Sequence, residues 1–215
     1  MFEQQKVLIK FLKKKYKKIN KQILDRLGLA SLVIERNKTK SFLILGKIQK
    51  DIILWAFENR NKNNPKGLFI VSPPGTGKTT AVKFSLEIMK KPWIWINLYE
   101  VFDENFVKEV LEEIDYAKIV VIDEIREPFM SDKKILLFLE RLIPKLYATN
   151  KTPIFICNPP TKEEDSYRTL FEKFSVNSIS KLSEMTKTLK YFNNETFNFR
   201  LLLVFEKKMK KSFPI

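Results

Sequence analysis

Histidine is missing from this 215-residue sequence, and cysteine occurs only once, as Cys157. Without histidine the chain cannot form a Cys/His zinc site or use Ser-His-Asp chemistry. A lone cysteine cannot form an intramolecular disulfide, and this absence is typical of proteins from a reducing compartment. We therefore expect a cytoplasmic protein, associated with the nucleoid or, if the gene comes from a mobile element, with the host cytoplasm.

Long apolar runs are also missing. No uninterrupted run approaches the roughly 18 residues that a membrane-spanning helix needs. The first residues, MFEQQKVLIKFLKKKYKK, have lysines within their apolar stretch and no small-residue cleavage site after it, so we do not expect a secretory signal peptide. The sequence therefore predicts no membrane-embedded segment.

Acidic residues are scarce in one part of the chain only. The sequence has 40 Lys and Arg against 25 Asp and Glu, a formal net charge of +15. Residues 1–66 hold 17 basic and 5 acidic residues, whereas residues 67–215 hold 23 and 20. We call residues 1–66 the basic head. A basic head beside a nearly neutral remainder of the chain favours a polyanionic partner bound by the head, although a solvated lysine-rich face would have the same composition.

The basic head is predicted to contain an amphipathic helix over residues 4–27, with apolar residues spaced three and four apart. Lysines fill its other faces, and a second lysine run lies near the end of the chain, at residues 207–211. Such lysines predict salt-sensitive phosphate contacts without reading of base edges, which fits single-stranded DNA bound without sequence preference. A basic amphipathic helix can also lie on an anionic membrane or dock on a partner protein.

Short apolar runs alternate with helical patterns from Gly67 onwards. Strands are predicted at residues 67–71, 93–98, 118–124 and 152–158, and helices at residues 78–90, 103–114 and 131–148, the last with Ser131 as its N-cap. Upstream, two short strands at residues 31–35 and 41–45 and a helix at residues 47–60 precede a polar linker at residues 61–66. The alternation predicts an α/β fold, a three-layer parallel sheet with helices on both faces.

The segment Ser72–Thr80, SPPGTGKTT, follows an apolar strand and opens a helix, which is the context of a phosphate-binding P-loop. Gly75 and Gly77 let backbone N–H groups turn toward phosphate oxygens, and the helix N-terminus adds its positive dipole end. Lys78 can reach the β- and γ-phosphates of ATP, and Thr79 can supply a hydroxyl ligand for Mg²⁺.

Contacts with the nucleotide are predicted along most of this loop. The residues expected to hold it are Pro74, Gly75, Thr76, Gly77, Lys78, Thr79 and Thr80. The pattern GxxxxGK[ST] begins with glycine, whereas this chain has Ser72, a small residue that still permits the turn.

Two acidic residues end the predicted strand at 118–124. Asp123 is expected to hold Mg²⁺ through water, and Glu124 to orient and polarise the attacking water. Because parallel strands end at the same edge of a sheet, both acids should lie beside the P-loop. Asn158 ends the next predicted strand and is a candidate hydrogen-bond donor to the attacking water or the γ-phosphate, although asparagine at a strand end is often a cap or turn residue.

These segments resemble the AAA+ ATPases. SPPGTGKTT is similar to their Walker A motif, IVVIDE to Walker B and IFICN to sensor 1. Within AAA+ the chain resembles the DnaC/DnaI/IstB helicase-loader-like group, through PKGLFIVSPPGTGKT, IDEIREPFMSDKKILLFLERLI and SISKLSEMTKTLKYF. The resemblance covers about residues 47–200, and its specific parts are Walker A and Walker B.

The resemblance implies a homo-oligomer that binds ATP between subunits, with an arginine from the neighbouring subunit completing each site. Where the family has that arginine this chain has Lys181, and lysine cannot form the bidentate fork of arginine. Either Lys181 or the nearby Arg168 is therefore the candidate trans cation, and Arg200 is a candidate sensor 2 residue. The short segment after Asn158 implies a reduced or absent helical lid.

The sequence therefore predicts residues 1–46 as a basic, mainly helical region that contacts DNA or a partner, and residues 47–215 as an AAA+ ATPase domain. By resemblance, the domain hydrolyses ATP to ADP and phosphate in a helicase-loader-like switch for replication or transposition, with a replicative helicase as a candidate partner. Two alternatives are a superfamily 3-like replication initiator helicase and a nucleotide-gated DNA-binding or packaging accessory with weak hydrolysis.

Overall fold

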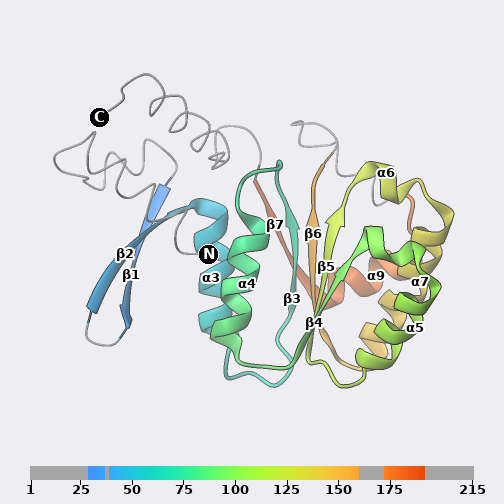
Figure 1. Cartoon of the computed structure of the whole chain (residues 1–215), viewed down its shortest axis with the longest axis horizontal. Helices are drawn as coiled ribbons and strands as arrows, with labels where there is room; N and C mark the ends of the chain where they lie inside the picture. Colours follow the sequence, from blue (N-terminus) through green and yellow to red (C-terminus); the bar gives the residue numbers. More distant parts are fainter. Residues whose placement is uncertain (1–28, 37–38, 160–171, 192–215) are drawn as a thin grey trace.

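The computed structural model describes residues 29–36, 39–159 and 172–191. Its body is a five-stranded parallel sheet with helices on both faces and the strand order β4-β5-β6-β3-β7 (Figure 1). This architecture confirms the predicted three-layer α/β class. In chain order the elements are β1 (Leu29–Arg36), β2 (Thr39–Gly46), α3 (Lys47–Asn59), β3 (Gly67–Val71), α4 (Lys78–Met89), β4 (Trp93–Asn97), η1 (Leu98–Phe102), α5 (Glu104–Glu113), β5 (Ile119–Ile125), α6 (Glu127–Met130), α7 (Lys133–Ala148), β6 (Thr152–Cys157), α9 (Val176–Met185) and β7 (Thr186–Lys190).

The four strands predicted from Gly67 onwards form within one residue of their predicted bounds. The prediction of Ser131 as the N-cap of α7 is wrong. Asp132 is the cap, and its Oδ1 accepts hydrogen bonds from the backbone N–H groups of Lys134 and Ile135 at 2.8 and 3.2 Å. A carboxylate at this position also complements the positive end of the helix dipole, whereas Ser131 terminates the short helix α6.

Two apolar layers hold the sheet between its helices. On one face α3 and α4 bury residues such as Ile52 and Val82 against β3 and β6. On the other face α5, α7 and α9 bury residues such as Leu142 and Leu182. The central strands are covered on both sides, which explains why β3 and β6 are apolar runs without alternation. Burial also raises the pKa of the Cys157 thiol to about 12, so this side chain is an inert core residue.

Helix α3 belongs to the same body as the sheet. The Ser85 hydroxyl of α4 donates to the carbonyl oxygen of Ile52 at 3.2 Å, and the Trp55 indole donates to the carbonyl oxygen of Lys66 at 3.0 Å. The polar segment 61–66 is therefore a loop within one packed unit. Upstream, β1 and β2 form the predicted antiparallel hairpin, which stands beside α3 and apart from the main sheet (Figure 1).

Several predictions fall outside the described residues: the helix at 4–27, the lysine run at 207–211, Arg168, Arg200 and the extent of the lid. Within the ranges given above, none of the helices is both long enough and apolar enough to cross a membrane.

Gly67 begins β3 where the backbone of β6 approaches very closely. A Cβ atom built on Gly67 would lie 1.8 Å from the carbonyl oxygen of Pro153, so a side chain cannot fit unless a central strand moves. Gly67→Ala is expected to lower the free energy of unfolding by about 1–3 kcal/mol, because overpacking forces backbone shifts. Urea unfolding measures this effect, with Lys66→Ala at the neighbouring exposed position as control. Equal stability of the two variants would contradict the close approach.

Candidate functional site

The loop from β3 to α4 is built from two left-handed glycines. Gly75 has a φ of 84° and Gly77 a φ of 81°, a region in which residues with a Cβ are strained. Gly77 is also the N-cap of α4 and has no side chain that could cap the helix. The N–H groups of the first turn of α4 therefore point toward the concave side of the loop without a side-chain acceptor, which is the arrangement that binds anions.

Side chains inside the loop hold its shape. The fully buried Ser72 hydroxyl lies 2.6 Å from the Thr76 hydroxyl, which also donates to the carbonyl oxygen of Pro73 at 3.1 Å. Ser72 stands where the P-loop pattern has its first glycine, and its hydroxyl thus connects the beginning of the loop to Thr76 by a hydrogen bond. Lys78 as a residue is only 5% exposed, and its ammonium donates to the carbonyl oxygens of Ser72 and Pro73 at 2.7 and 3.1 Å.

Gln49 of α3 lies directly against the loop, and the sequence analysis did not identify it. A Cβ atom on Gly77 would lie 1.9 Å from Gln49 Nε2, so a side chain there would displace the Gln49 amide, while the φ of 81° is what favours glycine at this position. The amide of Gln49 is buried, and its Oε1 accepts from the backbone N–H of Gly46 at 3.2 Å. In the sequence, the one available signal for Gln49 was a polar residue on the apolar side of the helix predicted at 47–60.

Asp123 comes close to the P-loop, as predicted. Its Oδ2 accepts a hydrogen bond from the Thr79 hydroxyl at 3.2 Å, and its Oδ1 accepts from the backbone N–H of Glu124 at 2.8 Å. Burial raises the pKa of the Asp123 carboxyl above its ordinary value, and the neighbouring charge of Glu124 acts in the same direction. The two hydrogen bonds and the charge of Lys78 oppose this rise.

A β-bulge in β5 sets the direction of the two acids. Ile122 pairs with Phe155 and Ile125 pairs with Cys157, so β5 has one more residue than β6 in this interval. Glu124 lies in the bulge with a φ of 64°, a left-handed conformation that is rare for a residue with a side chain. Bulges of this kind re-aim side chains next to functional sites.

The Glu124 carboxylate is partly exposed and faces Arg126, whose Nε lies 3.7 Å from Glu124 Oε2. On the neighbouring strand, Asn97 is in register with Asp123 at the same edge of the sheet. The Asn97 amide donates to Glu100 at 3.4 Å and accepts from the Trp95 indole at 3.2 Å. Neither Arg126 nor Asn97 was identified from the sequence. The proximity of Asn97 to Asp123 depends on strand order, whereas Arg126 lies only two residues after Glu124 and its place in the sequence was the available signal.

The remaining predicted residues divide into two groups. Asn158 follows β6, and its backbone N–H donates to the carbonyl oxygen of Ile125 at 2.8 Å, which places it beside the end of the acidic strand. Pro74 lies exposed at the tip of the loop, and Thr80 lies in the first turn of α4. Lys181 is elsewhere: it lies on α9, across the sheet from α4, and its ammonium donates to Asn177 Oδ1 at 2.7 Å.

The donor set at this edge matches the chemistry of a magnesium nucleotide. The Thr79 hydroxyl and the Asp123 carboxylate are hard oxygen ligands 3.2 Å apart, and Mg²⁺ prefers one or two such groups together with waters and phosphates. The left-handed glycines and the free end of α4 suit the phosphates themselves. The residues present therefore fit ATP and Mg²⁺.

Asp123→Asn tests the cost of burying this carboxylate. Since folding raises its pKa, the folded state holds the proton more tightly, and stability falls as pH rises from the unfolded pKa through the folded one. The asparagine oxygen can accept from the backbone N–H of Glu124, and its NH2 group can donate to the Thr79 hydroxyl, so both contacts are possible without the charge. In a metal chelator, we expect Asp123→Asn to melt at a higher temperature than the unmodified protein at neutral pH, with the gain shrinking toward acidic pH. Asp132→Asn, which keeps a helix cap, is the control; a pH-independent difference for Asp123→Asn would contradict the buried-charge explanation.

Comparisons with known proteins agree with this geometry. Residues 68–160 match the family described as "ATPase family associated with various cellular activities (AAA)", a segment that contains the P-loop, both acids and Asn158. No curated protein sequence matches the chain. A solved structure of the DnaC helicase loader superposes with a TM-score of 0.53 at 19% identity, over 66% of this chain and 86% of that chain.

Two further structures are less similar. DnaA from Aquifex aeolicus bound to AMPPCP superposes with a TM-score of 0.48 at 14% identity, over 80% of this chain and 55% of that chain. The RuvB Holliday junction branch migration motor of Thermotoga maritima gives 0.46 at 12% identity, over 68% and 45%. At these identities the structural likeness concerns the fold. The family match over residues 68–160, together with the P-loop and the parallel sheet, gives this part of the chain the fold and motifs of an AAA+ P-loop ATPase.

Proposed function

We propose that this protein is an ATP-dependent, DNA-associated AAA+ ATPase, a helicase-loader-like switch in replication or transposition that assembles on DNA and hydrolyses ATP. One observation carries the nucleotide part of this proposal: the Thr79 hydroxyl of the P-loop helix donates to the Asp123 carboxylate of β5 at 3.2 Å. That contact joins the phosphate-binding and metal-binding halves of one site.

Binding of ATP is assigned to the loop and the first turn of α4. Residues from Pro74 to Thr80 surround the phosphates, with backbone N–H groups donating from the left-handed turns. Lys78 has its ammonium held by the carbonyl oxygens of Ser72 and Pro73 at the base of the loop, so it is positioned as a fixed positive charge for the β- and γ-phosphates.

Hydrolysis is assigned to the acidic edge. The Thr79 hydroxyl and, through water, the Asp123 carboxylate would hold Mg²⁺, which would neutralise charge on the phosphate oxygens. Glu124 orients the attacking water and accepts its proton, for which its carboxylate must turn from Arg126 toward the P-loop. Asn158 is assigned a hydrogen bond to that water or to the γ-phosphate.

A neighbouring copy is proposed to complete the site. Lys181 lies on α9, across the sheet from α4, and is thus placed to serve another subunit better than its own. Among the described residues, its ammonium donates to Asn177 of the same helix. A lysine stabilises transition-state charge as a point charge and lacks the planar fork of arginine, so we expect slow turnover.

The loader-like role rests on three supports of different kinds. The sequence resembles the helicase-loader-like group in its Walker A and Walker B segments. The DnaC helicase loader has the same fold over most of its length. The basic excess of residues 1–66 favours a nucleic-acid partner, and by resemblance a replicative helicase is the candidate protein partner.

Glu124→Gln separates binding from hydrolysis. The amide keeps the size of the side chain but cannot accept the proton of the attacking water, so we expect unchanged ATP affinity and a turnover reduced by about 100-fold or more. Calorimetry measures the affinity and phosphate release measures the turnover. Glu127→Gln, three residues further along on the surface, is the control. Full turnover of Glu124→Gln would remove Glu124 from the mechanism.

The function as a whole is tested by measuring ATPase rate and particle size together, with and without single-stranded DNA. We expect DNA to increase both, and ATP to be required for the larger assembly. Lys78→Ala removes the positive charge facing the phosphates, so it should lose ATP binding and remain small. A monomer with the same ATPase rate in the presence and absence of DNA would refute the switch, and intrinsic unwinding by the protein alone would favour an initiator helicase.

A further inference from the structure

The amino-terminal ends of the strands, at the edge opposite the P-loop, carry a row of lysines. Four adjacent strands each begin one or two residues after a lysine: Lys91 precedes β4, Lys118 precedes β5, Lys151 precedes β6 and Lys66 precedes β3. Because neighbouring strands lie about 4.8 Å apart, the row extends roughly 14 Å along the sheet. Figure 1 shows the beginnings of these strands at the lower end of the sheet, at the opposite end of β3 from the loop that leads to α4.

Backbone hydrogen bonds fix the order of this row. The N–H of Lys118 donates to the carbonyl oxygen of Pro92 at 2.8 Å, and the N–H of Thr152 donates to the carbonyl oxygen of Lys118 at 2.9 Å. The Thr152 hydroxyl donates to the carbonyl oxygen of Pro65 at 3.2 Å. The residues that lead into the four strands are therefore held side by side by the sheet itself.

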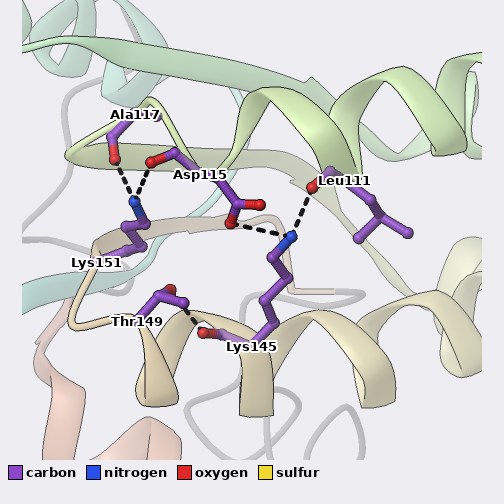
Figure 2. A network of polar contacts seen from close by, with 6 residues as sticks. All are labelled: Leu111, Asp115, Ala117, Lys145, Thr149 and Lys151. Atoms are coloured by element: carbon purple, nitrogen blue, oxygen red, sulfur yellow. Dashed lines mark hydrogen bonds and ion pairs between the residues drawn. The ribbon is translucent and has the colours of Figure 1, made fainter.

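Two lysines near β6 are anchored by carbonyl oxygens (Figure 2). Lys151 Nζ donates to the carbonyl oxygens of Asp115 and Ala117 at 2.8 and 2.9 Å. Lys145 Nζ donates to the carbonyl oxygen of Leu111 at 2.6 Å and lies 3.1 Å from the Asp115 carboxylate. Carbonyl oxygens satisfy the donors without cancelling their charge, and Asp115 already neutralises Lys145. The positive charge of Lys151 is thus left without a carboxylate partner among the described residues.

The positive charges at this edge are close enough to repel one another. Burial lowers the pKa of Lys91, and the charge of Lys118 lowers it further. Burial and then Lys118 lower the pKa of Lys151 in the same way, against the opposing effect of Asp115. Lys66 and Lys118 are exposed. An anion bound along the row would relieve this repulsion.

Large aromatic side chains lie exposed along the same edge. Tyr116, two residues before Lys118, is 84% exposed, and Trp93, the first residue of the edge strand β4, is 52% exposed.

At the other end of the row, a hollow of about 220 Å³ opens between Lys66 and Lys151. Its polar lining includes Asn64 and Asn150, and Glu184 is the carboxylate that borders it.

We propose that this edge is a binding surface for single-stranded nucleic acid, on which lysines contact phosphates while Tyr116 and Trp93 stack on unpaired bases. Lysines together with exposed aromatic rings, which here lie at the β4 and β5 end of the row, are the combination that binds single strands without sequence preference. The bases of a duplex are already stacked and paired, so exposed rings gain little from it. The proposal goes beyond the nucleotide switch, since the surface lies at the opposite end of the strands and needs no ATP.

Photo-cross-linking of the full chain to an oligo(dT) that carries bromodeoxyuridine tests the location. We expect mass spectrometry to find the cross-links on the peptides that contain Tyr116 or Trp93. Cross-links confined to residues 1–28 or 192–215 would overturn the proposal, even if the oligonucleotide binds tightly. Lys78→Ala should keep the same cross-links, so failure of the nucleotide site and failure of this surface are separable.

Fluorescence anisotropy at several salt concentrations tests the chemistry. Replacing Lys66 and Lys118 together by glutamate should reduce the slope of log affinity against log salt by about 1.4, since each single-strand phosphate contact contributes about 0.7. Tyr116→Ala should weaken binding about tenfold through one lost stacked base. Lys108→Glu on α5, which reverses one exposed charge instead of two, is the control and should reduce the slope by less than either single reversal in the row. All variants should keep ATP affinity. An unchanged slope, or equal competition by polyglutamate, would overturn the proposal.

Discussion

The hydrogen bond from Thr79 to Asp123 joins residues 44 positions apart, and the functional site depends on the packing that makes it. The strands β3 and β5, which lead to these residues, are not neighbours, because β6 lies between them. Thr79 nevertheless contacts Asp123, because Thr79 lies in the first turn of α4, after the loop that follows β3, and Asp123 lies at the bulge in β5. A change in the register of β6 would separate the loop from the acids without altering either motif.

The same edge concentrates charges and backbone conformations that do not favour stability. Lys78 and Asp123 are each only 5% exposed, and both lose hydration on folding. Three residues, Gly75, Gly77 and Glu124, have left-handed backbone angles. Such features persist when the surroundings hold them firmly, and here two apolar layers cover the sheet on both faces. The stable core and the less favourable site are therefore parts of one arrangement.

In a parallel sheet all strands begin at one end and finish at the other, so the two ends present different chemistry. In this chain the carboxyl ends of the strands carry backbone N–H groups that suit an anion, and the amino ends carry lysine side chains. At the carboxyl edge, turned N–H groups and a helix start form an anion site out of the backbone. At the amino edge, lysine side chains donate to carbonyl oxygens in and after the last turn of α5: Lys145 to that of Leu111, and Lys151 to those of Asp115 and Ala117. Of the four lysines in the row, Lys151 is therefore held by backbone carbonyl oxygens, whereas Lys66 and Lys118 are exposed.

The sequence by itself determined the class of fold and the location of the phosphate loop. Short apolar runs rich in β-branched and aromatic residues, such as GLFIV and TPIFIC, are typical of strands covered on both faces, and two glycines before Lys78 at a strand–helix junction fit a P-loop far better than a chance turn. The predicted approach of Asp123 to Thr79 is confirmed because strand ends in a parallel sheet share one edge. These features are local, or follow from one rule of topology.

Tertiary structure decided what depends on neighbours distant in the chain. Gln49 beneath Gly77, Asn97 in register with Asp123 and the bulge at Glu124 follow from strand order and helix packing, which no local pattern specifies. The four lysines look unrelated in the sequence, separated by dozens of residues, and only hydrogen bonding between β3, β4, β5 and β6 brings them into one row. Periodicity reports which face of an element is apolar, whereas the identity of the neighbouring element is a property of the assembled sheet.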